Sequence, residues 1–554
     1  DTYSGTQEYI VNRGGPNIPI GLYRSVFIEN TIWNHDLIGN YSTTFGQDIS
    51  FTATIGANAR LDEYKQNGIE SSDQVVFGLV NHDNFRTQSG INSFTGVSLQ
   101  YNQEFNRYGL YGSFSAGYKD YVYLNISGRQ DWASTVEENN NSIFYPSVSA
   151  SFIPTTAFGL ESDVINYIKI RAGYATSAGF PTPYNTRNFL GSSARGFIRQ
   201  DGTVVTSNSV SNFLGNPNLK PELQEETEIG IEAQFLNKRL GIDLTLYSRD
   251  TKDLITAAPL DPSTGFTVTN INVGRISNKG IELGLTGTPV QTGELKWDLT
   301  FNFSLYRSFV EELGSGLTQV QVPGGAFTNL GNFAIEDQPF NVILGSTVVR
   351  EPSTGKRLVG ADGNYVVSDD IGIIGNPNPD WTSALISTLS WKGFALSAQL
   401  DYRHGGDIYS TTIASLLGRG VTKDTDITRE NTFILDGVQA DGSPNTVQIT
   451  SSNYYFDNVG FGASELQMYD GTTIRLRELS LSYNLPSSLV SKTPFKKVSL
   501  SLSGQNLWFN AINTPKHINF DTDVLSTGVG NGLGFDFLTG PSSRRYGATL
   551  RITL

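Results

Sequence analysis

The 554-residue chain contains no cysteine, one methionine and only four histidines, His35, His82, His404 and His517. Without cysteine the protein can form no disulfide, no thiolate zinc site and no cysteine nucleophile. The histidines lie far apart in the sequence and none belongs to a His-Glu-x-x-His pattern, so their spacing predicts no zinc site. We find no constellation of catalytic residues, and we therefore expect no metal, no cofactor and no enzymatic activity.

The chain also lacks long apolar runs and basic charge. No stretch reaches the roughly 18 consecutive apolar residues of a membrane-spanning helix, which argues against an α-helical membrane protein. The net charge of −14 argues against a nucleic-acid partner, because neutralising phosphates requires basic patches. The sequence starts at Asp1 without a methionine or a signal-like apolar segment, so we expect a mature, processed or partial chain.

What the chain does contain is alternation. Apolar and polar residues alternate strictly in segments 228–235 and 240–247, which are joined by a turn of about three residues. Because successive strand side chains point to opposite faces, each segment would have one apolar and one polar face. A soluble sandwich could contain one such hairpin. The pattern recurs, however, at 295–306 and 546–554, and repeated ten-residue alternation is typical of a transmembrane β-barrel whose apolar face meets lipid.

The predicted fold is therefore all-β, a transmembrane antiparallel up-and-down barrel with about fifteen strands in this chain. A soluble glycan-active enzyme would instead show polar outer faces and carboxylates clustered at strand ends. We expect the strands at residues 24–43, 48–62, 108–119, 121–132, 144–154, 165–177, 225–236, 239–255, 268–288, 295–312, 381–391, 393–409, 473–486, 495–510 and 544–554.

The connections between these strands alternate between short and long. In outer-membrane barrels the short turns are periplasmic and the long loops are extracellular. With a periplasmic C-terminus, this alternation places every long loop outside the cell and makes the number of strands in this chain odd. Because bacterial single-chain barrels have an even number of strands, we expect an odd number of strands before residue 1. The short connections lie near 44–47, 120, 155–164, 237–238, 289–294, 392 and 487–494; the long ones lie at 63–107, 133–143, 178–224, 256–267, 313–380, 410–472 and 511–543.

Two local patterns fit a barrel wall. Trp381 and Trp391 bracket one predicted strand on the same side, as the two aromatic girdles of an outer-membrane barrel would require. In segment 474–483 the apolar positions change parity, and a β-bulge there would return them to the lipid face.

Several segments, taken together and in order, resemble one family, the SusC-like (RagA-like) subgroup of TonB-dependent outer-membrane transporters of Bacteroidota. These segments are Gly128-Arg129-Gln130-Asp131, Phe144-Tyr145-Pro146-Ser147-Val148-Ser149-Ala150, Ile168-Lys169-Ile170-Arg171-Ala172-Gly173-Tyr174, Asn216-Pro217-Asn218-Leu219-Lys220-Pro221-Glu222, Asn278-Lys279-Gly280-Ile281-Glu282-Leu283, Gly375-Asn376-Pro377-Asn378-Pro379-Asp380, Asp470-Gly471 with Ile474-Arg475-Leu476-Arg477-Glu478-Leu479, and Gly504-Gln505-Asn506-Leu507.

The resemblance implies that residues 1–554 are the C-terminal portion of a receptor barrel, about the later two-thirds of a barrel of about 22 strands. The plug domain, the TonB-binding segment and the first strands have no counterpart in the chain. The last residue departs from the family pattern, because it is Leu554 where such barrels usually end in an aromatic residue.

The function implied by the resemblance is active import of a nutrient, a glycan or a peptide, across the cell outer membrane. A SusD-like surface lipoprotein would act as a lid, TonB would supply energy through a region absent from this chain, and dimers of the paired proteins are expected. The alternative is a SusC-like barrel that serves as a structural scaffold in an outer-membrane assembly or secretion complex.

Candidate substrate-binding residues lie where a predicted strand reaches the extracellular rim. They are Arg403, His404, Asp407 and Tyr409. The fragment Asp362–Tyr365, Asp-Gly-Asn-Tyr, resembles part of a calcium loop, but it lacks the later bidentate glutamate, and turn chemistry explains it better.

Overall fold

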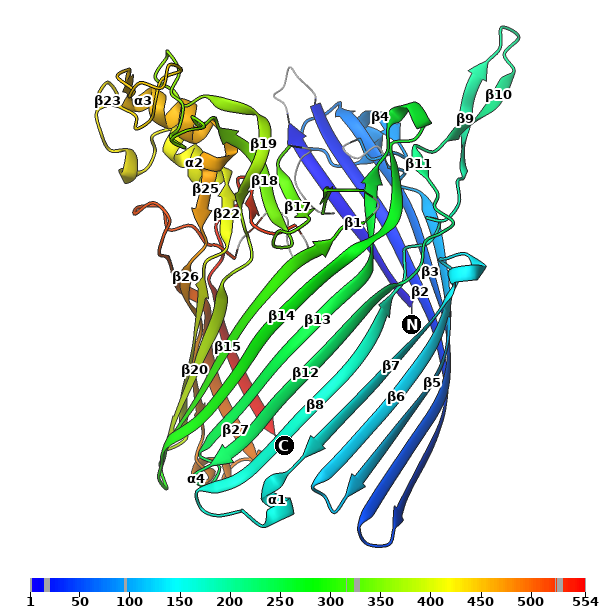
Figure 1. The fold of residues 1–554 in the computed structure, drawn as a ribbon, viewed down its shortest axis with the longest axis vertical. Coiled ribbons are helices and arrows are strands. Elements are labelled where there is room, and N and C mark those ends of the chain that lie inside the picture. Colours follow the sequence, from blue (N-terminus) through cyan, green and yellow to red (C-terminus); the bar gives the residue numbers. More distant parts are fainter. Residues whose placement is uncertain are drawn as a thin grey trace.

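The computed structural model describes residues 2–13, 20–93, 97–314, 316–322, 329–523, 525 and 532–553. A curved antiparallel sheet forms a tall wall, and long loops carrying small sheets and helices crown one end of it (Figure 1). No helix in the described part of the chain is long and apolar enough to cross a membrane.

The main sheet has eighteen strands in the described residues. Two of them, β4 (Phe85–Ser89) and β11 (Phe213–Leu214), are short additions at the loop end, which leaves sixteen strands in the wall. Each wall strand pairs antiparallel with the next wall strand along the chain, and β1 and β29 form the two edges. The wall strands are β1 (Thr2–Arg13), β2 (Ile20–Phe45), β3 (Ile49–Gln74), β5 (Tyr101–Tyr118), β6 (Val122–Ala133), β7 (Ser142–Phe152), β8 (Ile165–Gly179), β12 (Glu222–Phe235), β13 (Leu240–Pro259), β14 (Val268–Gln291), β15 (Leu295–Glu312), β20 (Trp381–Trp391), β21 (Phe394–His404), β26 (Thr473–Asn484), β27 (Lys497–Ala511) and β29 (Arg545–Thr553).

The predicted all-β, up-and-down architecture is confirmed, with sixteen wall strands where we expected about fifteen. We expected no strand before residue 24, but β1 lies there and pairs with β2 from Thr2 opposite Thr31 to Arg13 opposite Ile20. Its apolar residues Tyr9, Ile10 and Val11 are consecutive, so alternation could not reveal it, and the backbone ladder alone places it in the sheet. With sixteen wall strands, the expected odd count does not hold.

Strands β2 and β3 extend further toward the loops than alternation indicated. β3 continues twelve residues beyond the predicted end at 62, through a segment of mixed charge. Arg24 of β2 donates to the Glu70 carboxylate of β3, and Arg60 donates to Asp62 at 2.6 Å. Above the lipid both faces of a strand can be polar, so the alternation that marks a membrane strand disappears there.

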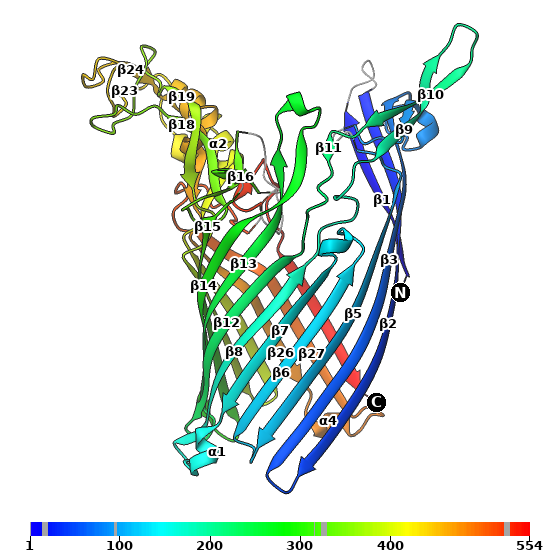
Figure 2. The same cartoon turned by 45° about the vertical axis from the view of Figure 1, so that its right-hand side comes forward.

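Successive connections alternate between the two ends of the wall as predicted, but their lengths do not always alternate: the predicted long connections 134–141 and 260–267 are shorter than the predicted short ones at 153–164 and 485–496. The turns, with α1 (Pro154–Phe158) and α4 (Ser487–Val490), lie at the end of the wall opposite the long loops (Figure 2). The tight β12–β13 turn contains Leu236, Asn237 and Lys238 in left-handed conformations, with φ of 57°, 56° and 62°, which is characteristic of hairpin connections.

The outer face of the wall is apolar along rows that cross the strands. Leu246, opposite Ile229 and Ile281, is 43% exposed, as lipid contact requires of a large apolar side chain. The predicted girdles are also present. Trp381 packs against Tyr402, with ring centroids 4.9 Å apart, and Trp391 lies at the opposite end of β20, half exposed.

The predicted β-bulge is confirmed at Arg477. Both neighbours of β26 shift register there: on the β27 side the pairing passes from Leu476 directly to Glu478, and the β21 side does the same. The extra residue keeps Leu476 and Leu479 on the same outer face of the wall.

Three long loops, 313–380, 405–472 and 512–544, pack together into what we call the loop lobe. Its centre contains Ile343, Tyr409 and Phe535, one from each loop, all at most 7% exposed. A separate hairpin of β9 (Leu190–Ile198) and β10 (Val204–Val210) projects from another side of the rim (Figure 2). The lobe elements are β16 (Gln319–Gln321), β17 (Gly331–Ile335), β18 (Val342–Val348), β19 (Val367–Gly375), β22 (Asp407–Ser410), α2 (Thr411–Gly418), β23 (Thr432–Ile434), β24 (Gln448–Thr450), α3 (Ser451–Asn453), a π-helix (Tyr454–Gly460), β25 (Met468–Asp470) and β28 (Phe535–Asp536), with 3-10 turns at Lys423–Thr425 and Ser464–Gln467. Other 3-10 turns lie at His82–Asn84, Glu138–Asn140 and Pro262–Thr264.

Candidate functional site: the luminal cavity

The polar residues of the alternating strands meet on the inner, luminal face of the wall. Arg171 of β8 donates to Asp243 at 2.7 Å and to Thr245 at 2.6 Å, both on β13. Strand β12 runs between them and carries Gly230 at the crossing point, where an added Cβ would lie 2.7 Å from the Arg171 Nε. The glycine therefore gives the guanidinium room to lie flat across the strand and reach its partners.

A longer ladder of ion pairs follows strand β26. Arg477 donates to Asp401 of β21 at 2.6 Å and to Asp523 at 2.8 Å. Arg475 lies 3.2 Å from Asp523 and donates from Nη1 to Asp521 at 3.0 Å. Arg475 and Asp521 are only 3% and 5% exposed. A buried pair of this kind holds two segments in fixed register, because either charge alone would be costly to bury.

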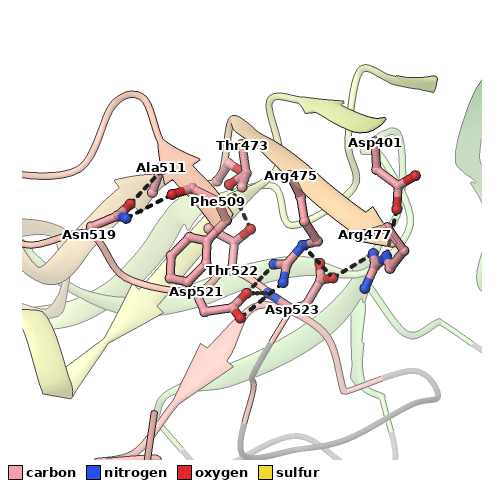
Figure 3. Close-up of polar contacts among 11 residues, drawn as sticks. Asp401, Thr473, Arg475, Arg477, Phe509, Ala511, Asn519, Asp521, Thr522 and Asp523 are labelled. Atoms are coloured by element: carbon pink, nitrogen blue, oxygen red, sulfur yellow. Dashed lines mark hydrogen bonds and ion pairs between the residues drawn. The ribbon is translucent and has the colours of Figure 1, made fainter. Parts of the chain in front are cut away.

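The two aspartates, Asp521 and Asp523, come from the loop that joins β27 to β29. This loop folds back over the loop ends of β26 and β27 (Figure 3). Thr522 contacts Thr473 through hydroxyls 2.8 Å apart, and Asn519 donates to the Phe509 carbonyl at 2.9 Å. Burial alone would raise the pKa of Asp521, but hydrogen bonds from Arg475 and Ser542 hold that pKa below its usual value. The ionised carboxylate of Asp521 thus holds this loop against the wall through Arg475.

The ion pairs of Arg171 and Arg477 line a cavity of about 760 Å³ on the luminal face, together with Arg475. Most of its charges are paired, but Arg403 has no carboxylate within ion-pair distance among the described residues. Its guanidinium donates instead to the carbonyls of Gly405 at 3.2 Å and Pro377 at 3.0 Å. The charged lining residues are Arg171, Asp243, Glu282, Asp401, Arg403, Arg475, Arg477 and Asp523.

The structure does not bring the four predicted rim residues together in this cavity. Arg403 lines it. His404 lies on the other face of β21, with its ring stacked on Trp381 at 5.4 Å. Asp407 accepts from the Asn376 amide at 2.8 Å, and burial raises the pKa of its carboxyl. Tyr409 is buried in the lobe against Phe535, 5.9 Å away.

Sequence reasoning missed Asp521 and Asp523. They lie 46 residues beyond the arginines that they pair with, in a loop without periodicity. The spacing of Asp521 and Asp523 matches that of Arg475 and Arg477, but this match becomes informative only when the loop is known to fold inward.

The calcium-like fragment forms a turn. The side-chain oxygens of Asp362 accept from the Asn364 backbone amide at 3.1 Å and from the Asn364 side-chain amide at 2.9 Å, and Gly363 is left-handed with φ of 84°. This is the turn chemistry expected from the sequence.

Comparisons with known proteins agree with this architecture. The family model for TonB dependent receptor-like β-barrels matches residues 3–507. A TonB-dependent receptor of Formosa agariphila is 26% identical over 94% of this chain and 53% of its own length. SusC of Bacteroides thetaiotaomicron is 26% identical over 33% of this chain and 20% of its own length.

The fold has a counterpart among solved structures. The RagAB peptide transporter structure superposes with a TM-score of 0.72 at 20% identity, covering the whole of this chain and 58% of the other. This chain therefore spans little more than half the length of the Formosa receptor and of the RagAB chain. From the family match, which covers most of the chain, we conclude that the chain belongs to the TonB-dependent receptor β-barrel family of the outer membrane; it is similar in sequence to SusC and shares the fold of the RagAB structure.

Proposed function

We propose that this chain forms most of the wall of an outer-membrane transporter that imports a nutrient with energy supplied through TonB. The observation that carries the proposal is the contrast between the two faces of the wall. The outer face is apolar and exposed, as lipid requires. The luminal face carries a cavity lined by charged and hydrogen-bonding side chains, which suits a polar cargo passing through the barrel.

The cargo class that we propose is a glycan or a peptide, captured with a SusD-like lipoprotein lid. The family motifs and the relationship to SusC support this, and the RagAB structure is described as that of a peptide transporter. The loop lobe offers the lid a preformed surface, because its three loops share one buried core. We further propose that two such pairs associate as a dimer.

Within the cavity, we propose that Arg403 contacts the cargo. The hydrogen bonds of Arg403 go to two backbone carbonyls; Asp407, Asp470 and Asp523 act on its charge from farther away, and no carboxylate in the described part of the chain forms an ion pair with it. Its planar fork of donors suits carboxylate, phosphate or sulfate groups. The neighbouring His404, Asp407 and Tyr409 would position the rim and the base of the lobe around it.

The test is deletion of the gene in its native bacterium, followed by growth on a panel of glycans and peptides as sole nutrients. We expect growth to fail on one class and to return with the wild-type gene. Arg403→Gln should lower uptake with unchanged surface levels, and Arg403→Lys should restore part of it. If every nutrient still supports growth while other outer-membrane proteins disappear from the surface, the scaffold role is correct and the import proposal is wrong.

A further inference from the structure

A second cavity lies between two loops of the lobe, beside the loop end of β27. Its volume is about 980 Å³, and we call it the outer cavity. Loop 405–472 contributes Thr422 and Lys423, β27 contributes Asn506 and Phe509, and loop 512–544 contributes Phe520 and Arg544. Because Asp521 lines this cavity and Arg475 lines the luminal one, the buried Arg475–Asp521 pair lies between the two.

The outer cavity is positively charged although the chain as a whole carries −14. Lys423 and Arg544 have no carboxylate within 4 Å in the part of the chain that the structure describes. Asp521, which lines the cavity, pairs with Arg475, and Asp424, which follows Lys423 in the sequence, accepts from the His517 amide at 3.0 Å and contacts its ring. Two cations therefore remain available to an anionic ligand.

The cavity also presents hydrogen-bond acceptors without donors. The Asn506 Oδ1 and the Thr422 Oγ1 are buried atoms with no hydrogen-bond partner in the described structure. Leaving such atoms unsatisfied is unfavourable, and because both have less than 1 Å² of accessible surface, a ligand hydroxyl satisfies them once the two side chains rotate toward the cavity. Phe509 and Phe520 add apolar ring surface to the same lining.

From these features we propose that the outer cavity binds an acidic sugar unit, a pyranose that carries a carboxylate or a sulfate group. The anionic group pairs with Lys423 and Arg544, the hydroxyls donate to Asn506 and Thr422, and the apolar face of the ring packs on the phenylalanines. A short acidic peptide would match the cations but would offer few hydroxyl donors to the two oxygens. The inference builds on the proposed function by naming a cargo class and a second site for it.

The test measures binding, which does not depend on transport, so the two proposals can fail separately. The complete receptor is purified in detergent from outer membranes and titrated calorimetrically with digalacturonate, a sulfated disaccharide, maltose and a diglutamate peptide. We expect one or both acidic sugars to bind at least ten-fold more tightly than maltose and the peptide, and their affinity to fall as salt is raised.

The decisive variant is Lys423→Gln with Arg544→Gln, which removes both cations from exposed positions without disturbing an ion pair. We expect it to lose at least ten-fold in acidic-sugar affinity. Lys356→Gln is the matched control, because it removes an exposed lysine elsewhere in the lobe, and it should leave binding unchanged. Asn506→Asp should also weaken binding, since it places a negative charge in the cavity. Equal affinities for the double variant and the wild type, or tighter binding of the peptide than of either acidic sugar, would overturn the assignment.

Discussion

The two faces of the barrel wall differ in how their residues find partners. On the outer face, Leu246 and Ile281 are neighbours in adjacent strands. They contact lipid, which accommodates any apolar side chain. On the luminal face, Arg475 is satisfied by Asp521, a residue from another loop. The outer face therefore requires only that apolar residues recur at alternate positions, whereas a buried charge of the luminal face, such as Arg475, requires a specific partner of opposite charge. Substitutions can test that difference.

The largest effect should come from breaking the buried luminal pair. Arg475→Gln leaves the Asp521 carboxylate buried without its main partner, and we expect a loss of about 3–5 kcal/mol in the stability of the loop against the wall. The measurement is urea unfolding followed by proteolysis of the loop in reconstituted membranes. Arg477→Gln is the control, because Arg477 is 40% exposed and its loss should cost less. Equal losses would show that burial does not distinguish the two pairs.

The next effect tests the outer face. Leu299→Arg or Leu244→Arg places a charge in lipid near mid-strand, at a cost of about 2–4 kcal/mol, and should lower the amount of heat-modifiable, folded receptor. The matched change is Thr300→Arg, one residue away on the luminal face, which should be much milder. Thr245→Arg is a poorer control, since Thr245 accepts a hydrogen bond from Arg171. Similar surface levels for Leu299→Arg and Thr300→Arg would reverse the face assignment.

A smaller effect is expected in the loop lobe. Asp536 is fully buried and accepts hydrogen bonds from the Ser410 hydroxyl at 2.6 Å and the Thr412 amide at 3.1 Å. Asp536→Asn replaces an acceptor oxygen by a donor and should destabilise the junction of α2 and β28 by about 1–3 kcal/mol. Hydrogen exchange should rise in 407–418 and 533–539 but not in the wall, and an increase spread evenly over the wall would contradict this local role.

The smallest effect is a pH dependence at the same junction. Burial would raise the pKa of Asp536, but hydrogen bonds from Ser410, Thr412 and Thr539 outweigh it and hold the pKa below its usual value. A depressed folded-state pKa means that the stabilisation is complete above about pH 4 and is lost as pH falls through the folded-state pKa. Exchange in 407–418 should therefore stay constant from pH 7 to 5 and rise at lower pH, after correction for the intrinsic exchange rate. Asp536→Asn should abolish this dependence, and an unchanged profile in that variant would assign the effect to another group.

Much of the fold could be predicted from local pattern. Lipid imposes alternation on strands that cross it, so fifteen of the sixteen wall strands, the placement of successive connections at opposite ends of the wall, the girdle of Trp381 and Trp391 and the bulge at Arg477 were recoverable. Prediction failed where lipid imposes nothing. β1 has no alternation, and the loop end of β3 is polar on both faces. Both segments are strands because their backbones hydrogen-bond to β2.

The candidate site was much less predictable. Of the four rim residues, Arg403 alone lines the luminal cavity, because side chains one position apart on a strand point to opposite faces, and His404 therefore packs outside against Trp381. Asp407 and Tyr409 follow a turn after the strand has ended, and they are buried where β22 pairs with elements of distant loops.

By itself, the sequence determined the class of fold, the faces of the wall and the family, since alternation and short motifs are local properties that survive without knowledge of the partners. Tertiary structure alone decided where the charges meet. The pairing of Arg475 with Asp521, the packing of three loops around Phe535 and the two free cations of the outer cavity depend on loops that fold back over the wall. Loop closure of this kind is governed by contacts between residues far apart in the chain, and no periodicity records it.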